Sequence, residues 1–226
     1  MKKFRNAIVA AALAALFAVP FVGGLDGTSV SAQAPAGVVS YAPVPGGEYK
    51  IDPAHSLIGF AVRHLEINWV EGRFKDFSGT INFDDKDVTK SSVEFSAKVA
   101  SVDTEVEARD KHLRTADFFD AEKYPEMSFK STGVERKGKD AYVLHGELTI
   151  KGVTKPVALP FTLTGAVKDP WGNTRFGVEA QTKINRRDFQ INYGNAFAGG
   201  GLDVGNEVTI KLRLEAVQPA PKPAGQ

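Results

Sequence analysis

Apolar and polar residues alternate with a period of two in four segments of the chain. In residues 93–99, 142–150, 175–181 and 208–215, every second residue is apolar or small, and the residues between them are mostly polar or charged. Successive side chains of a strand point to opposite faces, so this period is typical of strands with one buried and one solvated face. The pattern therefore predicts an antiparallel sheet.

Short turn sequences separate the alternating segments. Lys-Gly at 137–138, Lys-Gly at 151–152 and Asp-Pro-Trp-Gly at 169–172 each lie beside such a segment. Connections of this length join neighbouring antiparallel strands as hairpins. About eight or nine strands fit between residues 48 and 217. This number favours an all-β fold, an antiparallel barrel of about eight strands that is either filled by side chains or holds one small ligand.

One stretch departs from the strand pattern. Thr104 and Glu107 have the spacing of a capping box ahead of a helix over residues 108–114, and Asp117 can cap a second short turn that ends at Pro125. We therefore expect a short helical insertion between two strands.

Residues 1–32 have the features of an export signal. Basic residues near the start precede an apolar run at 7–17, and Val30-Ser31-Ala32 forms a small-residue cleavage site. Pro20 interrupts the apolar region, which disfavours a retained membrane anchor. We expect a signal peptide cleaved after Ala32, a periplasmic mature chain, and no stable membrane span in that mature chain.

Proline-rich segments flank the strand pattern. Residues 33–47 and 218–226 combine proline with small and polar residues and show neither a strand nor a helix period. We expect the first to be a flexible linker and the second a disordered tail. The folded domain then covers residues 48–217.

Charge and composition exclude several classes of protein. Residues 1–32 hold Lys2, Lys3 and Arg5 against Asp26, so their removal changes the net charge from +1 to −1. A chain without excess basic charge is a poor nucleic-acid binder. The chain has no cysteine, which excludes disulfides, thiolate nucleophiles and cysteine-held zinc or iron–sulfur sites.

The four histidines give little support to a metal site, because no two have the i, i+4 spacing of a helical zinc motif. His64 continues the apolar face of the strand predicted at 56–64. We expect its side chain to point inward near one barrel end, as a hydrogen-bonded structural group or as part of a binding site. Haem or metal binding through His64 or His112 lacks a supporting ligand pattern, so we expect no cofactor.

Arg109, Asp110 and His112 crowd the predicted helix. Such a cluster can act as an acid–base set, but adjacent Arg and Asp commonly form local ion pairs that fix a loop. No nucleophile motif accompanies them, and His55 and Ser56 face opposite ways on a strand. We expect no catalytic residue.

Several blocks of the sequence resemble the YceI family, in order and at plausible spacing. They are residues 51–60, 72–79, 109–113, 117–120, 124–125, 146–157 and 185–189. The resemblance covers nearly all of residues 48–217. It implies a periplasmic, lipocalin-like barrel with helical insertions that binds polyisoprenoids or other long amphiphiles and has no settled enzymatic activity. Members of the family form dimers and are fused to membrane cytochromes, so the resemblance also allows a homodimer and a role near isoprenoid quinones.

With this resemblance, the inward aromatic and aliphatic residues become candidates for lining a lipid cavity, although ordinary core packing explains the same residues. The candidates are Phe60, Val62, Phe95, Phe129, Phe161, Phe176 and Ile184. A polar head group needs partners beside an apolar cavity. For this rim we expect His64, Arg109, Asp110 and His112.

The leading hypothesis is a non-catalytic carrier or sequestering protein for a long-chain isoprenoid lipid, of the polyprenol, polyprenyl phosphate or isoprenoid quinone type. Two alternatives stay open. The first is an enzyme acting on such a lipid, which requires the cluster on the predicted helix to face the cavity. The second is a filled structural barrel with a stress-related, partner-binding role.

Overall fold

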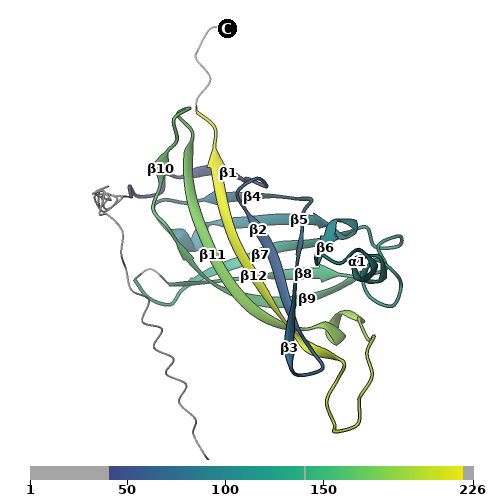
Figure 1. Ribbon diagram of the computed structural model, residues 1–226. Coiled ribbons are helices and arrows are strands. Elements are labelled where there is room, and N and C mark those ends of the chain that lie inside the picture. The colour runs from purple at the N-terminus through teal and green to yellow at the C-terminus, as the bar shows by residue number, and fades with distance from the viewer. Residues whose placement is uncertain (1–40, 140, 221–226) are drawn as a thin grey trace, which may run out of the picture. The chain divides into compact units, whose positions relative to one another are not determined.

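The alternating segments pair into one antiparallel sheet that closes on itself (Figure 1). The computed structural model describes residues 41–139 and 141–220. The strands are β1 (Gly47–Ile51), β2 (Leu57–His64), β3 (Asn68–Phe74), β4 (Phe77–Phe83), β5 (Ser92–Lys98), β6 (Val102–Asp103), β7 (Glu126–Arg136), β8 (Tyr142–Ile150), β9 (Val153–Leu163), β10 (Val167–Lys168), β11 (Thr174–Asn185) and β12 (Val204–Gln218). The helical elements are α1 (Glu107–Leu113) and the 3₁₀ turns η1 (Val88–Lys90), η2 (Val99–Ser101) and η3 (Arg186–Phe189).

Eight of the strands form the closed ring, in the order β1, β4, β5, β7, β8, β9, β11 and β12. Strand β12 completes it. One edge of β12 pairs with β11, and its other edge pairs with β1 and, farther along, with β2. Strand β2 follows β1, strand β3 precedes β4 and strand β6 follows β5, each after a short break. These three strands extend the sheet beyond the ring. The prediction of an antiparallel barrel of about eight strands with a short helix is confirmed.

The up-and-down order of the strands gives the barrel two distinct ends. We call the end that carries α1, η3 and the β2–β3 hairpin the α1 end. The opposite end, where β1 begins and β12 finishes, is the β1 end. The two longest connections, residues 99–125 between β5 and β7 and residues 186–203 between β11 and β12, lie at the α1 end, so loops can shape an opening there.

Inward side chains recur at every second position, as the sequence predicts. On β11, Phe176, Val178 and Ala180 face the interior. The parity changes once on β7, where Phe129 and Val134 both face inward. A shift in the β7–β8 register between Ser131 and Gly133 accounts for this, because one extra residue reverses the faces.

The expected flexible linker does not extend to residue 47. Ala42 pairs with Ala166, Val44 is buried in the core, and the Tyr49 hydroxyl donates to the carbonyl of Pro45 at 2.8 Å. Residues 41–46 therefore pack on the β1 end, where Val44 adds its side chain to the core while its neighbours stay exposed. The predicted signal peptide and the first part of the linker lie outside the described residues.

The predicted capping box is wrong, although the helix is present. The N-cap of α1 is Val106, and no side chain caps that end. Thr104 instead donates to the buried Asp110, so the partner three residues on, Glu107, is not used. The second short turn expected after Asp117 is a series of backbone turns rather than a helix. No helix within the described part of the chain is long and apolar enough to cross a membrane.

A network of charged side chains ties the last strands to the start of the barrel. Arg175 on β11 donates to Asp52 at 2.8 Å, to Glu215 of β12 at 2.5 Å and to Asp169 at 2.7 Å. We call these four residues the Arg175 network. Asp52 lies in the break between β1 and β2, so the network fastens three segments distant in sequence at the β1 end, where the ring closes.

The same contacts lower the pKa of two carboxyl groups. A hydrogen bond from His55, together with one from Arg175, outweighs partial burial and lowers the pKa of Asp52 from 3.8 to about 2. Burial alone would raise the pKa of Asp169, but hydrogen bonds from Arg175 and Asn173 outweigh it and bring that pKa to about 2.

We predict that Arg175→Met lowers the free energy of unfolding by about 2–3 kcal/mol, between the values typical of exposed and of buried ion pairs. The methionine keeps the packing of the stem but leaves three carboxylates without their shared cation. Urea denaturation measures the loss. Arg213→Met, at an exposed position of β12, is the control and should change stability by no more than about 0.5 kcal/mol. Equal effects of the two substitutions would show that the network does not hold the ring.

We also predict that stability falls in acid. Asp52 and Asp169 have lower pKa values in the folded than in the unfolded chain, so their contribution is complete above the unfolded pKa and is lost as pH falls from about 5 to about 2. The urea midpoint measured across this range should drop with each step down in pH. Arg175→Met should flatten that dependence; an unchanged slope would exclude the network as its source.

Candidate functional site

The barrel interior contains an apolar cavity of ≈230 Å³. A cavity of about 10–15 Å³ is enough to hold one water molecule, so this cavity is much larger than a packing defect. Phe83 and Val88 line it at the β1 end, and Phe118 and Ile191 line it at the α1 end. The cavity therefore runs along the barrel, and the barrel's own side chains do not fill it.

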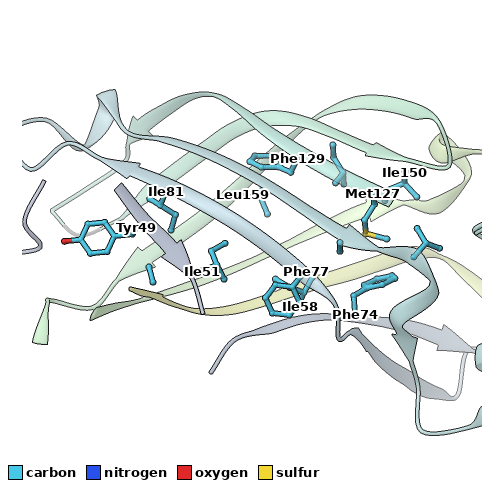
Figure 2. Close-up of a cluster of buried hydrophobic side chains, with 14 of the residues drawn as sticks. Tyr49, Ile51, Ile58, Phe74, Phe77, Ile81, Met127, Phe129, Ile150 and Leu159 are labelled. Carbon is cyan, nitrogen blue, oxygen red and sulfur yellow. The ribbon is translucent and has the colours of Figure 1, made fainter. Parts of the chain in front are cut away.

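All seven residues predicted to line a cavity do so. They are Phe60, Val62, Phe95, Phe129, Phe161, Phe176 and Ile184. Figure 2 shows side chains of the surrounding core, with Phe129 and Leu159 opposite Ile58 across the space between the strands. Alternation alone identifies these residues, because one face of each strand must point inward. Their role in ligand binding stays a prediction.

The loops at the α1 end contribute wall residues that the sequence analysis missed. These are Leu113, Phe118, Phe119, Phe189 and Ile191. They follow no strand period, since they belong to the helical insertion and to the connection after β11. The one available signal was the apolar character of Leu113, Phe118 and Phe119 within a stretch otherwise rich in charge.

Two glycines on the strands make room for aromatic rings of the wall. A Cβ atom on Gly146 would lie 2.3 Å from Phe129, and one on Gly72 would lie 2.4 Å from Phe60. Both distances are far below van der Waals contact, so any larger residue would displace the ring. These glycines fix the position of two aromatic side chains of the wall.

Two cavity-lining residues have polar side chains, and both side chains are engaged by backbone groups. Ser91 accepts a hydrogen bond from the Asp84 amide at 3.0 Å. Arg186 donates to the backbone carbonyls of Gly205, Ile191 and Val204. The other lining residues are glycine or have apolar side chains, which suits an aliphatic chain and offers no acid–base group.

The structure does not place Arg109 and Asp110 on the cavity wall, contrary to the expected rim. Asp110 is buried and accepts from the amide and hydroxyl of Thr104 at 2.9 and 2.5 Å. Arg109 donates to the hydroxyl and carbonyl of the same threonine, both at 2.8 Å. The two residues fix the loop before α1 through Thr104, because the helix lacks a capping side chain there.

The expectation of an inward His64 is also wrong. Its side chain is exposed and does not line the cavity. His64 pairs with Asn68 and Val204 at the end of β2, and the β2–β12 register shifts between Val204 and Val208. The inward face of β2 ends at Val62, since the β2–β3 hairpin projects past the ring at this point (Figure 1).

His112 is the one residue of the expected rim that contacts the cavity wall. Its ring meets Phe118 and Tyr193 edge-on, with centroids 5.0 and 4.8 Å apart. Its Nε2 atom lies 2.9 Å from a carboxylate oxygen of Asp117. Lys151 joins the same two loops by donating to the carbonyls of Ala116 and Gln190. The α1 loop and the loop after η3 therefore meet at this stack and cover the α1 end.

This barrel and its cavity have counterparts among known proteins. Residues 49–216 match the model of the YceI-like domain. The chain belongs to the YceI-like family. Protein YceI of Escherichia coli O17:K52:H18 is 42% identical over 173 residues, which cover 76% of this chain and 87% of that protein.

Solved structures share the fold. Burkholderia cenocepacia BcnA has 28% identity and a TM-score of 0.63 over 73% of this chain and 98% of that one. A polyisoprenoid binding domain from Saccharophagus degradans, implicated in plant cell wall breakdown, has 17% identity and a TM-score of 0.59 over 76% of this chain and 98% of that one. At this identity, the second likeness shows the fold alone.

One cluster in this YceI-like domain has the donor types of a metal site. Ligand atoms of Asp52, His55 and Glu215 lie within 4.8 Å of one another. Arg175 already donates to both carboxylates, and the hydrogen bond that the His55 ring donates to Asp52 raises the pKa of His55. A guanidinium and a readily protonated imidazole neutralise these carboxylates, so the cluster is an ion network without need of a metal.

We predict that Asp110→Ala destabilises the domain by about 1–3 kcal/mol, because the buried amide and hydroxyl of Thr104 lose their acceptor. Thermal or urea unfolding measures this. Asp117→Ala removes an exposed carboxylate from the same loop and should cost less than about 1 kcal/mol. A loss of ligand binding in Asp110→Ala without any loss of stability would instead place Asp110 at the ligand.

Proposed function

We propose that this chain binds a long isoprenoid amphiphile, with the hydrocarbon tail in the barrel cavity, and acts as a carrier or sequestering protein. The observation that carries the proposal is the apolar cavity, which runs from Phe83 at one end to Phe118 at the other. An empty apolar cavity lowers the stability of a barrel, because the side chains around it lose van der Waals contacts, and a bound hydrophobic ligand restores these contacts.

The driving force is the transfer of hydrocarbon out of water. Each buried CH₂ group contributes about 0.8 kcal/mol, so even a tail of a few isoprene units gains substantial binding energy. The many rings and branched aliphatic side chains of the wall suit a methyl-branched chain better than a polar ligand. A head group finds its partners near the ends of the cavity rather than along its length.

The family supports the same ligand class. The chain shares its fold with a domain described as binding polyisoprenoids, and it belongs to the YceI-like family. The residues that had suggested acid–base chemistry give no support to an enzyme, since Arg109 and Asp110 hold Thr104. Binding without catalysis is therefore the function that the geometry favours.

The sequence supports a periplasmic site of action. Residues 1–32 have the features of a cleavable signal, and they lie outside the described residues. The proposal includes export and removal of this segment, which leaves Gln33 as the first residue. In this compartment, a carrier would shield an isoprenoid chain from water between membranes.

Native mass spectrometry of the chain purified from the periplasm tests the proposal. The expected mass is that of residues 33–226 plus one ligand, and organic extraction should release an isoprenoid or quinone-like compound. A protein that contains no ligand and does not bind added polyprenols or quinones would contradict ligand binding in the cavity. It would indicate that the protein acts through the outer surface of the barrel. Retention of residues 1–32 would refute cleavage after Ala32 alone.

We predict that Ala180→Phe abolishes uptake of the ligand while leaving the domain folded. Ala180 faces the cavity from the middle of β11, so a phenyl ring there occupies space that the tail requires. Fluorescence displacement of a polyene probe measures binding. Glu179→Phe adds the same ring to the exposed face of the same strand and should retain full binding. Equal binding by both variants would contradict tail burial in the cavity.

A further inference from the structure

Large apolar side chains are exposed together at the α1 end. Of the nine that are exposed in residues 41–139 and 141–220, six lie at that end. Five of the six belong to the β2–β3 hairpin and to the loop between η3 and β12. We call them the apolar tip: Leu65, Ile67, Trp69, Tyr193 and Phe197. Both segments project past the ring of strands, as Figure 1 shows, so the tip faces solvent.

Contacts hold the hairpin and the loop together. The amide of Leu65 in the hairpin donates to the carbonyl of Asp203 at the end of the loop, at 3.0 Å. A Cβ atom on Gly201 would lie 2.4 Å from the ring of Phe197 and 3.1 Å from the side chain of Glu66, so loop and hairpin meet at this glycine. The two segments therefore form one projecting unit.

The turn of the hairpin uses residues that do not suit its backbone. Leu65 and Glu66 have φ angles of 51° and 58°, and the Ile67 amide donates to the His64 carbonyl at 3.1 Å. Two left-handed residues in a two-residue hairpin loop are typical of a type I′ turn, which favours Asn-Gly or Gly-Gly. Such a pair would form the turn with less strain and without exposed hydrocarbon. The fold does not require an apolar tip, which indicates a role in an interaction.

The residues of the hairpin follow the order of layers at a bilayer surface. Ile67 is 78% exposed beside the turn, and Trp69 lies two residues farther back. Arg63 stacks over the Trp69 ring, with its guanidinium carbon 4.5 Å from the ring centroid. Aliphatic side chains suit the hydrocarbon boundary, whereas tryptophan and arginine suit the level of the phosphates. No carboxylate of the described residues lies within 4.0 Å of the Arg63 nitrogens, so this charge complements a lipid phosphate.

The apolar tip is small for a protein partner. A stable protein interface buries roughly 800 Å² on each side and involves about 20–30 residues. The tip has five residues, and four of them expose less than half of their surface. They lie on narrow projections, which suit insertion between lipid head groups better than contact with a second copy of the chain.

The apolar tip is continuous with the cavity wall, because the Tyr193 ring packs against the wall residue Phe118 with centroids 4.7 Å apart. We propose that the apolar tip docks the α1 end on a lipid bilayer, with Ile67 inserted most deeply and the charge of Glu66 keeping the insertion shallow. The inference rests on the proposed function and adds its partner. A ligand with a long hydrocarbon tail resides in membranes, and docking places the cavity beside that source.

The two tryptophans of the chain report on opposite ends of the barrel. Trp69 belongs to the apolar tip, and Trp171 is exposed in the β10–β11 hairpin at the β1 end. Trp171→Phe leaves Trp69 as the fluorophore, and Trp69→Phe leaves Trp171. Each full mature chain is mixed with phosphatidylcholine vesicles, with or without brominated acyl chains. We expect the Trp69 emission to shift to shorter wavelength and to be quenched by the brominated chains, and the Trp171 emission to stay unchanged.

Substitutions assign the docking to the tip. Ile67→Glu should weaken vesicle binding, measured by co-sedimentation, by about tenfold or more, because the transfer of an exposed isoleucine out of water is lost. Val167→Glu is the matched control, since Val167 is an exposed apolar residue of β10 at the β1 end, and it should bind vesicles as the wild type does. Both variants should take up a polyene probe from solution normally. From vesicles, Ile67→Glu should take it up more slowly.

The outcomes separate docking from ligand binding. A Trp69 emission that does not respond to vesicles, or equal responses of Trp69 and Trp171, would overturn docking through the apolar tip. So would a Trp69 shift that needs no vesicles and grows with protein concentration, because a second copy would then cover the tip. None of these results affects uptake of the probe from solution. Failure of the wild-type chain to take up that probe would overturn the proposed function, while the vesicle measurements would still decide the docking.

Discussion

The pairing of β12 along both of its edges is the interaction on which the rest of the structure depends. One edge pairs with the whole length of β11, and the other pairs with β1 and β2. Without this strand the sheet would be open, and its inward apolar face would be exposed to water. With it, the face becomes the wall of a cavity, and the Arg175 network fastens the closure at the β1 end. The cavity therefore owes its existence to backbone pairing, and its apolar lining to the side chains of one face.

The alternation of residues predicted this part of the structure well, for a simple physical reason. In a closed antiparallel barrel each strand has one inner and one outer face, so parity along the sequence determines the position of every side chain. Phe60, Phe95 and Phe176 could be assigned to the interior with no knowledge of which strands pair. The one change of parity, on β7, needed the register shift at Gly133, which no local pattern reveals.

The candidate rim was harder to predict, because it depends on contacts between loops. The spacing of Thr104 and Glu107 predicted a capping box between these two residues. In the folded chain the amide and hydroxyl of Thr104 donate instead to the buried carboxylate of Asp110. His64 follows the apolar parity of β2, but it lies at the end of that strand, where the β2–β3 hairpin projects away from the cavity and the β2–β12 register shifts. Arg186 lay in a block noted for its resemblance to a family, and its burial beside the cavity depends on three carbonyls supplied by β12 and by the loop after η3. Polar residues act through partners distant in sequence, so periodicity says little about them.

Closure between the first and last strands also sets an order of events. The contacts of β12 with β1 and β2 join residues at opposite ends of the domain, and such long-range contacts form late in folding. A chain still emerging during synthesis or translocation can form the hairpins from β7 to β9, since these are local. It has no enclosed interior until residues 204–218 are available to pair. The enclosed cavity is consequently a property of the finished chain alone, and a chain that lacks its last strand has no interior in which a hydrophobic molecule could be held.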